Sequence, residues 1–303
     1  MTSPSHTRAG GMPYALAAYS LWGMIPLYFL QVRHIPALEM VGWRVLFTIP
    51  VCLALVMVRK QAGAVRAAVA DRRTFAYLTL SAGLIGTNWL VYLVAIQMNQ
   101  VLAASLGYYI NPLINVVLGT TVLKERLSRL QWLAVATATV GVAILAWGAR
   151  DMLWISLSLA LSFSVYGLVR RQAPVESLPG LTIESAILMV PACGIVIWAA
   201  LGPAGSSLGQ SIFTDAMLAI SGLITGVPLL LFAVAARRMP YSTLAFVQFI
   251  APSLVFVLGL TIFEEPLRPL QLACFGFIWT ALAIFCLDLL LRRRGQGAAA
   301  AAR

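Results

Sequence analysis

The feature that most constrains this chain is the length of its apolar stretches. Of 303 residues, 61% are hydrophobic and only 10% are charged, whereas a soluble domain carries about 25% charged residues. The apolar runs are roughly 18 to 24 residues long, about what a helix needs to cross a bilayer. They lack the alternation that is typical of transmembrane barrels. The sequence therefore predicts an all-α integral membrane protein.

We predict ten transmembrane helices joined by short links. Because the links leave little chain for a soluble domain, the function is expected within the membrane. The predicted spans are residues 12–31, 36–58, 74–97, 101–122, 130–148, 152–170, 181–201, 214–236, 241–262 and 270–291.

The net charge of +11 could suggest a nucleic-acid partner, but the distribution of the charges indicates topology instead. With the N-terminus inside, 17 of the 21 Lys and Arg residues fall on the inner side. Arg33, Arg150 and Arg268 fall on the outer side, and Arg44 lies within a helix. An excess of basic residues in cytoplasmic links is the positive-inside pattern. We therefore expect no nucleic-acid partner, and both termini in the cytoplasm.

An internal repeat is the most specific signal in the chain. At an offset of 140, residues 110–131 match 250–271 at ten of 22 positions without a gap. The matches include Pro112 with Pro252 and Glu125 with Glu265. A weaker match, at an offset of 144, relates residues 20–23 to 164–167. The chain is therefore predicted to contain two five-helix copies.

Five helices are an odd number, so the second copy is expected to be inverted in the membrane. The charges support this independently, because basic residues change places between equivalent links: Lys124, Arg126 and Arg129 correspond to Glu264, Pro266 and Pro269, and Gln97 and Met98 to Arg237 and Arg238. We assign residues 1–150 to the N-terminal repeat, 151–291 to the inverted C-terminal repeat and 292–303 to a disordered cytoplasmic tail. Inverted repeats are a known architecture of secondary transporters, and the step to that function is an analogy.

Polar groups cluster beside the two equivalent prolines, which are expected to break their helices. Each proline frees the carbonyl four residues earlier, on Tyr108 and Gln248. Tyr108, Asn111 and Asn115 fall on one helix face. This stripe is interpreted as the lining of a central cavity, with interhelical hydrogen bonding as the alternative.

Further candidates lie on neighbouring helices. Asn88 is on the third predicted helix, next to Trp89 and Tyr92. Trp22 and Tyr166 are equivalent positions near the middle of their spans. Such central aromatic residues are suited to form the wall of a site for an organic solute, although aromatic residues also serve as ordinary interface anchors.

Arg44 is the charge of greatest interest, because a cation eight residues inside a span is costly unless it is paired or faces water. Glu184 lies near the equivalent position of the second copy, and Glu39 is an alternative partner. Arg44 is interpreted either as a substrate-binding group or as a structural pin. Glu125 and Glu265 lie in links, where we expect them to cap or position helices.

Several functions are disfavoured by what the sequence lacks. It contains no Walker A motif, no histidine within a span and no Ser/His/Asp set, so we expect no enzyme, no cofactor and no metal site. The absence of a midplane acid weakens a proton relay without excluding it.

The sequence resembles the RarD-type members of the EamA family, in the drug/metabolite transporter superfamily. The resemblance covers roughly residues 12–290. It rests on the run Ala104–Gly119, on the Glu125-Arg-Leu that follows, and on shorter motifs at 21–23, 43–46, 88–90, 166–170 and 249–253. It implies ten helices, a central cavity and a bacterial inner-membrane location, and relatives in the superfamily export amino acids and other metabolites.

Together these observations predict a multi-pass secondary transporter that exports small metabolites or drug-like amphipathic solutes by alternating access. Its partners would be a small-molecule solute and the lipid bilayer, with proton coupling and passive flux both left open. The alternative is a non-transporting membrane scaffold or receptor with a packed polar core. The sequence does not indicate the substrate, the direction of flux or the oligomeric state. The candidate substrate-binding residues are Trp22, Arg44, Asn88, Tyr108, Asn111, Asn115, Tyr166, Glu184 and Gln248, and the candidate helix breaks are Pro112 and Pro252.

Overall fold

The regular structure of the chain is helical wherever it is described. The computed structural model describes residues 10–98, 100–148, 153–203, 205–263 and 269–301. Its helices are α1 (Met12–Gln31), α2 (Ala37–Val58), α3 (Ala62–Ala70), α4 (Arg72–Gln97), α5 (Val101–Thr121), α6 (Arg129–Gly148), α7 (Leu153–Gln172), α8 (Ser177–Leu201), α9 (Ile212–Arg238), α10 (Tyr241–Gln248), α11 (Ile250–Thr261) and α12 (Pro269–Ala301).

Each predicted span coincides with a helix or, in one case, with two consecutive helices. Within the described residues, eight segments are long and apolar enough to cross a membrane: α2, α4, α6, α7, α8, α9, α10 with α11, and α12. The other two, α1 and α5, have 20 and 21 residues. The chain is therefore a multi-pass helical membrane protein.

The structure differs from the predicted boundaries in three places. The link after α2 contains α3, a nine-residue helix whose sequence is rich in alanine, the strongest helix former. Helix α8 begins at Ser177 rather than 181, because Pro179 falls in its first turn, where a proline is tolerated. Helix α12 continues to Ala301, through most of the segment that we expected to be disordered. That extension is also alanine-rich.

The two equivalent prolines behave differently. The ninth predicted span is divided at Phe249 into α10 and α11, three residues before Pro252. The expected break at Pro112 is not observed, since α5 runs through this residue without interruption. A proline removes only one hydrogen bond from a helix, and the flanking asparagines of α5 are hydrogen-bonded to neighbouring helices. These contacts keep the helix continuous.

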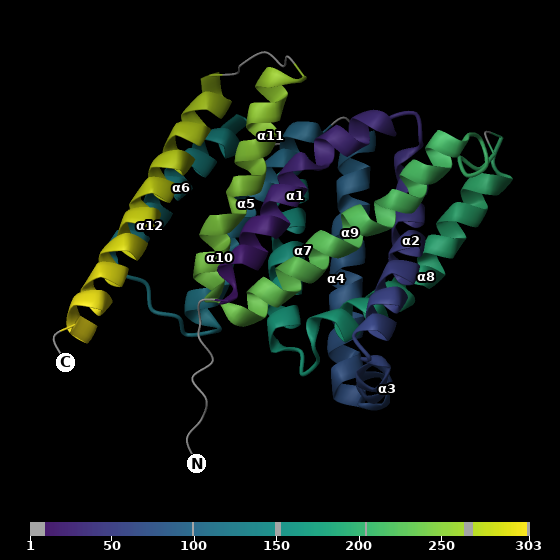
Figure 1. Cartoon of the computed structure of the whole chain (residues 1–303). Coiled ribbons are helices and arrows are strands. Elements are labelled where there is room, and N and C mark those ends of the chain that lie inside the picture. Colours follow the sequence, from purple (N-terminus) through teal and green to yellow (C-terminus); the bar gives the residue numbers. More distant parts are fainter. Residues whose placement is uncertain (1–9, 99, 149–152, 204, 264–268, 302–303) are drawn as a thin grey trace.

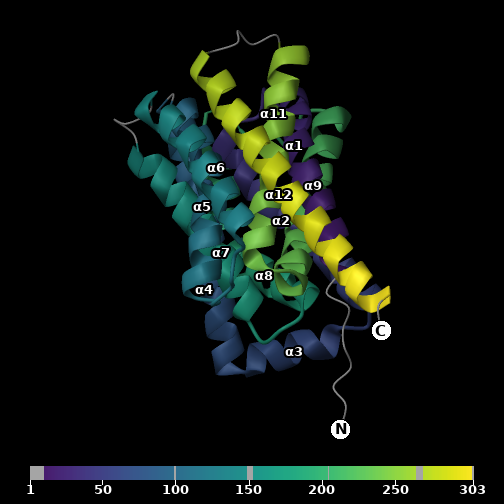
Figure 2. The same cartoon turned by 90° about the vertical axis from the view of Figure 1, so that its left-hand side faces the viewer.

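The helices form a central bundle with one peripheral pair (Figure 1). Helices α6 and α12 pack against each other along one side, and the view in Figure 2 shows the same pair in front of the bundle. Within the bundle, α7 packs on α5 and α4, whereas α1 packs on α11 and α9. Helix α2 packs on α8 and α9, and α4 also contacts α8.

The two ends of the bundle differ in charge. The α3 end, the lower end in Figure 1, carries the links 59–71, 122–128, 173–176 and 239–240. Most of the Lys and Arg residues lie in these links or in the helix ends next to them. In the described links at the opposite end, Arg33 is the only Lys or Arg residue. The first helix begins and the last helix ends at the α3 end (Figure 1).

Candidate functional site

The amide side chains of the predicted stripe form a buried hydrogen-bond network. The Nδ2 atom of Asn115 donates to Gln248 Oε1 at 2.9 Å and to Asn111 Oδ1 at 3.1 Å, and Gln248 Nε2 donates to Asn111 Oδ1 at 2.6 Å. Asn111 also donates to the Ala160 carbonyl. The three side chains are at most 5% exposed. The network therefore joins α5, α7 and α10, as the hydrogen-bonding alternative anticipates.

Asn88 has a similar environment on α4. Its Nδ2 atom donates to the Leu159 carbonyl and to Ser162 Oγ, both at 2.9 Å, and its side chain is buried. These bonds fasten α4 to α7, the most deeply buried of the candidate spans.

Trp22 and Tyr166 meet in one aromatic cluster. The Trp22 ring lies 5.6 Å from Phe163 and 5.7 Å from Phe232, and Tyr166 lies 5.8 Å and 6.0 Å from the same two rings. Tyr166 is fully buried, while Trp22 is half-buried. The cluster fills the space between α1, α7 and α9.

Glu184 pairs with Arg170, not with Arg44. Arg170 Nε lies 3.5 Å from Glu184 Oε1, and the two side chains are 1% and 2% exposed. Ser81 also donates to Glu184. Residue Gly180 makes the pair sterically feasible, because a Cβ atom there would overlap the Arg170 guanidinium. Arg170 was not among the predicted site residues. It precedes Arg171 at a helix end and was counted with the basic residues of the inner side.

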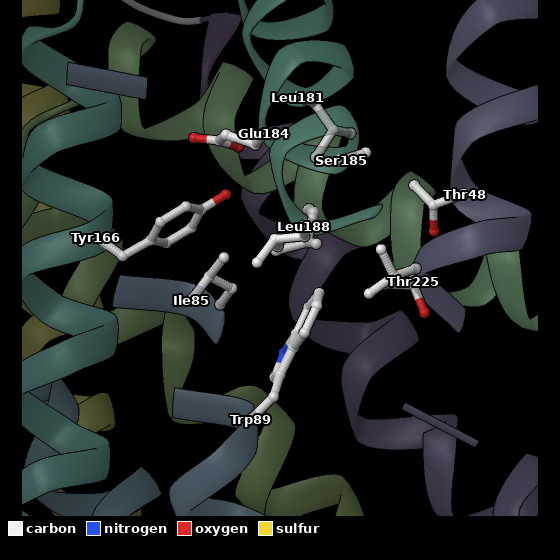
Figure 3. A pocket seen from close by; sticks show the side chains of 11 residues that line it. Thr48, Ile85, Trp89, Tyr166, Leu181, Glu184, Ser185, Leu188 and Thr225 are labelled. Carbon is white, nitrogen blue, oxygen red and sulfur yellow. The ribbon is translucent and has the colours of Figure 1, made fainter. Parts of the chain in front are cut away.

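This ion pair is not fully satisfied and borders a small cavity. Arg170 Nε and Nη1 and Glu184 Oε2 lack a hydrogen-bond partner among the described residues. The adjacent cavity of about 10 Å³ is lined by groups that include Glu184, Thr225 and Trp89, and it is about the size of one water molecule. Figure 3 shows the Tyr166 hydroxyl directed toward the Glu184 side of this space.

Arg44 lies beside the same cavity and has a different set of neighbours. Its Nε donates to Thr225 Oγ1 at 2.8 Å. The guanidinium carbon lies 5.6 Å from the ring centroids of both Phe29 and Trp89, within the range of a cation–π interaction. Among the described residues, the ion pairs are Arg170–Glu184 and Arg171–Glu125, so Arg44 has no carboxylate partner there. The side chain is partly exposed.

Two tyrosines complete the surroundings of Arg44. Tyr92 follows Trp89, which contacts the guanidinium, by three residues on α4, and the Tyr92 ring lies 6.2 Å from the Tyr108 ring. Tyr108 is 44% exposed although it lies well inside α5, whereas Asn111 and Asn115 on the same helix are 2% and 0% exposed. The predicted stripe is therefore divided between a packed part and an accessible part.

The remaining acidic candidates hold links in place. Glu125 accepts hydrogen bonds from the Tyr241 and Ser242 backbone N–H groups at 2.6 and 2.9 Å, which cap the start of α10. This agrees with the capping role expected for Glu125, whereas Glu265 lies outside the described residues. Glu39 is 1% exposed and accepts from Trp43 and from Ser206 and Ser207 of the α8–α9 link. Glu39 is therefore not the partner of Arg44.

Comparisons with known proteins give one consistent result. Residues 9–147 match the EamA-like transporter family. The chain is 42% identical to an uncharacterized transporter of Pseudomonas aeruginosa, over 92% of this chain and 93% of the relative. It is 39% identical to protein RarD of Escherichia coli K12, over 94% of this chain and 96% of the relative. A Pseudomonas aeruginosa relative named chloramphenicol-sensitive protein RarD is 29% identical over 94% of this chain and 97% of that relative.

The fold also has a counterpart among solved structures. One crystal structure matches with a TM-score of 0.70, at 17% sequence identity, over 92% of this chain and 98% of the other. At this identity the likeness concerns the fold alone.

Proposed function

Because the chain belongs to the EamA-like transporter family, we propose that it is a secondary transporter that exports small metabolites or drug-like amphipathic solutes by alternating access. The family and its relatives make it a bacterial multi-pass membrane transporter of the drug/metabolite kind. Export, the cytoplasmic membrane as its location and the cytoplasmic side of both termini are parts of the proposal.

The helix pairing supports two inverted five-helix halves. If each helix of the first half is exchanged for its counterpart in the second, the contact of α5 with α7 becomes that of α11 with α1. Likewise, the contact of α4 with α7 becomes that of α9 with α1, and α2 with α9 becomes α8 with α4. Contacts that occur in exchanged sets are what a two-fold relation between repeats produces.

The observation that carries the transport proposal is the contrast between the two ends of the bundle. Arg44 and Tyr108 are accessible within helices that begin at the end opposite α3. Toward the α3 end, the aromatic cluster, the Arg170–Glu184 pair and the Glu125 cap close the bundle. We infer that these two exposed side chains face the end opposite α3, which would correspond to one of the two states that alternating access requires.

A non-transporting scaffold remains the second candidate, because the buried Asn111–Asn115–Gln248 network is the packed polar core that such a protein would have. The accessible Arg44 and Tyr108 favour transport. Within the transport class, flux that follows an imposed pH gradient would indicate proton coupling, and flux that does not would indicate a passive facilitator.

The proposal is tested by comparing metabolites that accumulate in cells with and without the chain, followed by uptake assays in liposomes containing the purified protein. We expect at least one solute whose cellular level falls when the chain is produced and whose flux into liposomes is saturable. Failure of a broad panel of amino acids, nucleosides, organic acids and antibiotics to move in liposomes would contradict transport.

A further inference from the structure

We propose that Arg44, Tyr92 and Tyr108 form a binding site for an organic anion, a solute with one carboxylate group on an aromatic or other apolar body. This inference rests on the proposed transport function and names its solute class. The three residues come from α2, α4 and α5, and Arg44 and Tyr108 are each the eighth residue of their helix. At 1.5 Å per residue, each lies about 10 Å from the start of its helix.

The charge of Arg44 is not neutralised by the described protein. The two acidic residues within α2 and α8 are engaged elsewhere, Glu39 by the α8–α9 link and Glu184 by Arg170. A cation held within a membrane helix is costly unless it faces water or a counter-ion. A partly exposed Arg44 without a carboxylate partner is therefore suited to receive an anion from solution.

Hydrogen-bond donors at the site are unused. Arg44 uses Nε for Thr225, and its two terminal nitrogens make no hydrogen bond within the described part of the chain. The same is true of the Tyr92 and Tyr108 hydroxyls. The free edge of a guanidinium has the geometry for two parallel hydrogen bonds to one carboxylate. The tyrosine hydroxyls would donate further hydrogen bonds to the same group.

The guanidinium is also held in a fixed orientation. Phe29 and Trp89 each lie 5.6 Å from it, and the bond to Thr225 fixes its Nε edge. A preorganised receptor loses less conformational entropy on binding. The Trp89, Tyr92 and Tyr108 rings give the site an aromatic wall, which favours a solute with an apolar body over an inorganic anion.

The surroundings favour an anion over an amino acid. A zwitterion also needs an acceptor for its ammonium group, and the acidic side chains within α2 and α8 are already engaged, Glu39 by Ser207 and Glu184 by Arg170. Three probes that share a phenylethyl group separate these classes: 3-phenylpropionate has only the carboxylate, phenylalanine has both groups, and phenethylamine has only the amine. We expect 3-phenylpropionate to bind the purified full-length chain most tightly in calorimetric titrations, and phenethylamine not to bind.

Matched variants locate the binding. Arg44→Gln should weaken 3-phenylpropionate binding about 10- to 100-fold, as expected for the loss of charge-assisted hydrogen bonds. Tyr108→Phe should weaken it about 3- to 10-fold by removing one neutral hydrogen bond. Arg33→Gln removes the same charge from an exposed link at the same end and should leave the affinity unchanged. Because Tyr108 is exposed, Tyr108→Phe tests the site even if Arg44→Gln fails to fold.

The inference is overturned if none of the three probes binds, if phenethylamine binds at least as tightly as 3-phenylpropionate, or if the folded Arg44 and Tyr108 variants bind normally. Its failure can be distinguished from that of the proposed function. Binding of the anion without flux in liposomes would leave the site standing and contradict transport. Flux of neutral or cationic solutes that is insensitive to Arg44→Gln would support transport and contradict the anion site.

Discussion

Arg44 and Glu184 lie 140 residues apart, at the offset of the predicted repeat, and their environments differ. Glu184 is buried with Arg170 toward the α3 end, while Arg44 is partly exposed among aromatic rings. A buried ion pair stabilises a fold weakly, because desolvation offsets most of the attraction, but the loss of one partner leaves an uncompensated charge. A substitution of Glu184 should therefore lower the stability of the fold, whereas a substitution of Arg44 should weaken solute binding.

Glu184→Leu should lower the free energy of unfolding by about 3–5 kcal/mol, because it leaves the Arg170 charge buried without a partner. The double variant Arg170→Met with Glu184→Leu should recover much of this loss. Thermal unfolding of the purified chain in detergent measures both effects. A double variant no more stable than Glu184→Leu would show that the charges are not coupled as the structure indicates.

Cysteine labelling should divide the polar stripe of α5. In a background with Cys52, Cys193, Cys274 and Cys286 replaced by alanine, we expect a cysteine in place of Tyr108 to react with water-soluble thiol reagents. Cysteines in place of Asn111 or Asn115 should resist them, because those positions are buried. Resistance at all three would favour the packed scaffold, and labelling at all three would contradict the buried network.

The sequence indicated which polar residues lie inside the membrane-spanning helices, but it did not predict which residues they contact. Helical periodicity predicted Tyr108, Asn111 and Asn115 on one face, but in the structure Asn111 and Asn115 are buried while Tyr108 is 44% exposed. The partner of Glu184 was not predictable, because the contact between Arg170 and Glu184 depends on how α7 and α8 are oriented relative to each other. Charge patterns in a single sequence carry no information on that angle.

At the scale of elements, the cap of α10 is a connection between the two halves. Glu125 follows α5 in the first half, and the N–H groups that it accepts from begin α10 in the second. Arg171 lies 3.6 Å from the same carboxylate and donates to the last carbonyls of α9. Opening of the bundle toward the α3 end would have to break these contacts.

Glu125→Ala should speed amide hydrogen exchange in residues 239–246 about 5- to 30-fold, since a helix cap contributes about 1–2 kcal/mol. Mass spectrometry of peptides from the purified chain measures this. Glu176→Ala removes an exposed carboxylate at the same end and should leave these residues unaffected. Unchanged exchange in Glu125→Ala would show that the cap does not hold the start of α10.

The positions of the long apolar helices were predictable from hydropathy, whereas a short helix and the continuity of a helix across a proline were not. All ten predicted spans coincide with helices because apolar length is a strong signal. Helix α3 was missed because nine alanine-rich residues resemble any link, and the uninterrupted α5 was missed because its neighbours support the helix across Pro112. The break at Phe249 agrees with the prediction from Pro252.

For the whole molecule, the proposed inverted relation between the halves predicts the sides on which links are exposed. In the same cysteine-free background, a cysteine in place of Arg33 should react with an impermeant reagent in intact cells. A cysteine in place of Arg66, on the exposed side of α3, should react only after the cytoplasmic membrane is opened. Reaction of both from the same side would contradict the proposed topology.

The account as a whole depends on alternating access between two halves around one site. The most direct measurement is counterflow in liposomes, using the radiolabelled form of a solute identified by the metabolite comparison. Unlabelled solute on the opposite side of the membrane should accelerate labelled flux several-fold, because a transporter with solute bound reorients faster than an empty one. Flux that is absent, or that follows the gradient with no such acceleration, would contradict the mechanism.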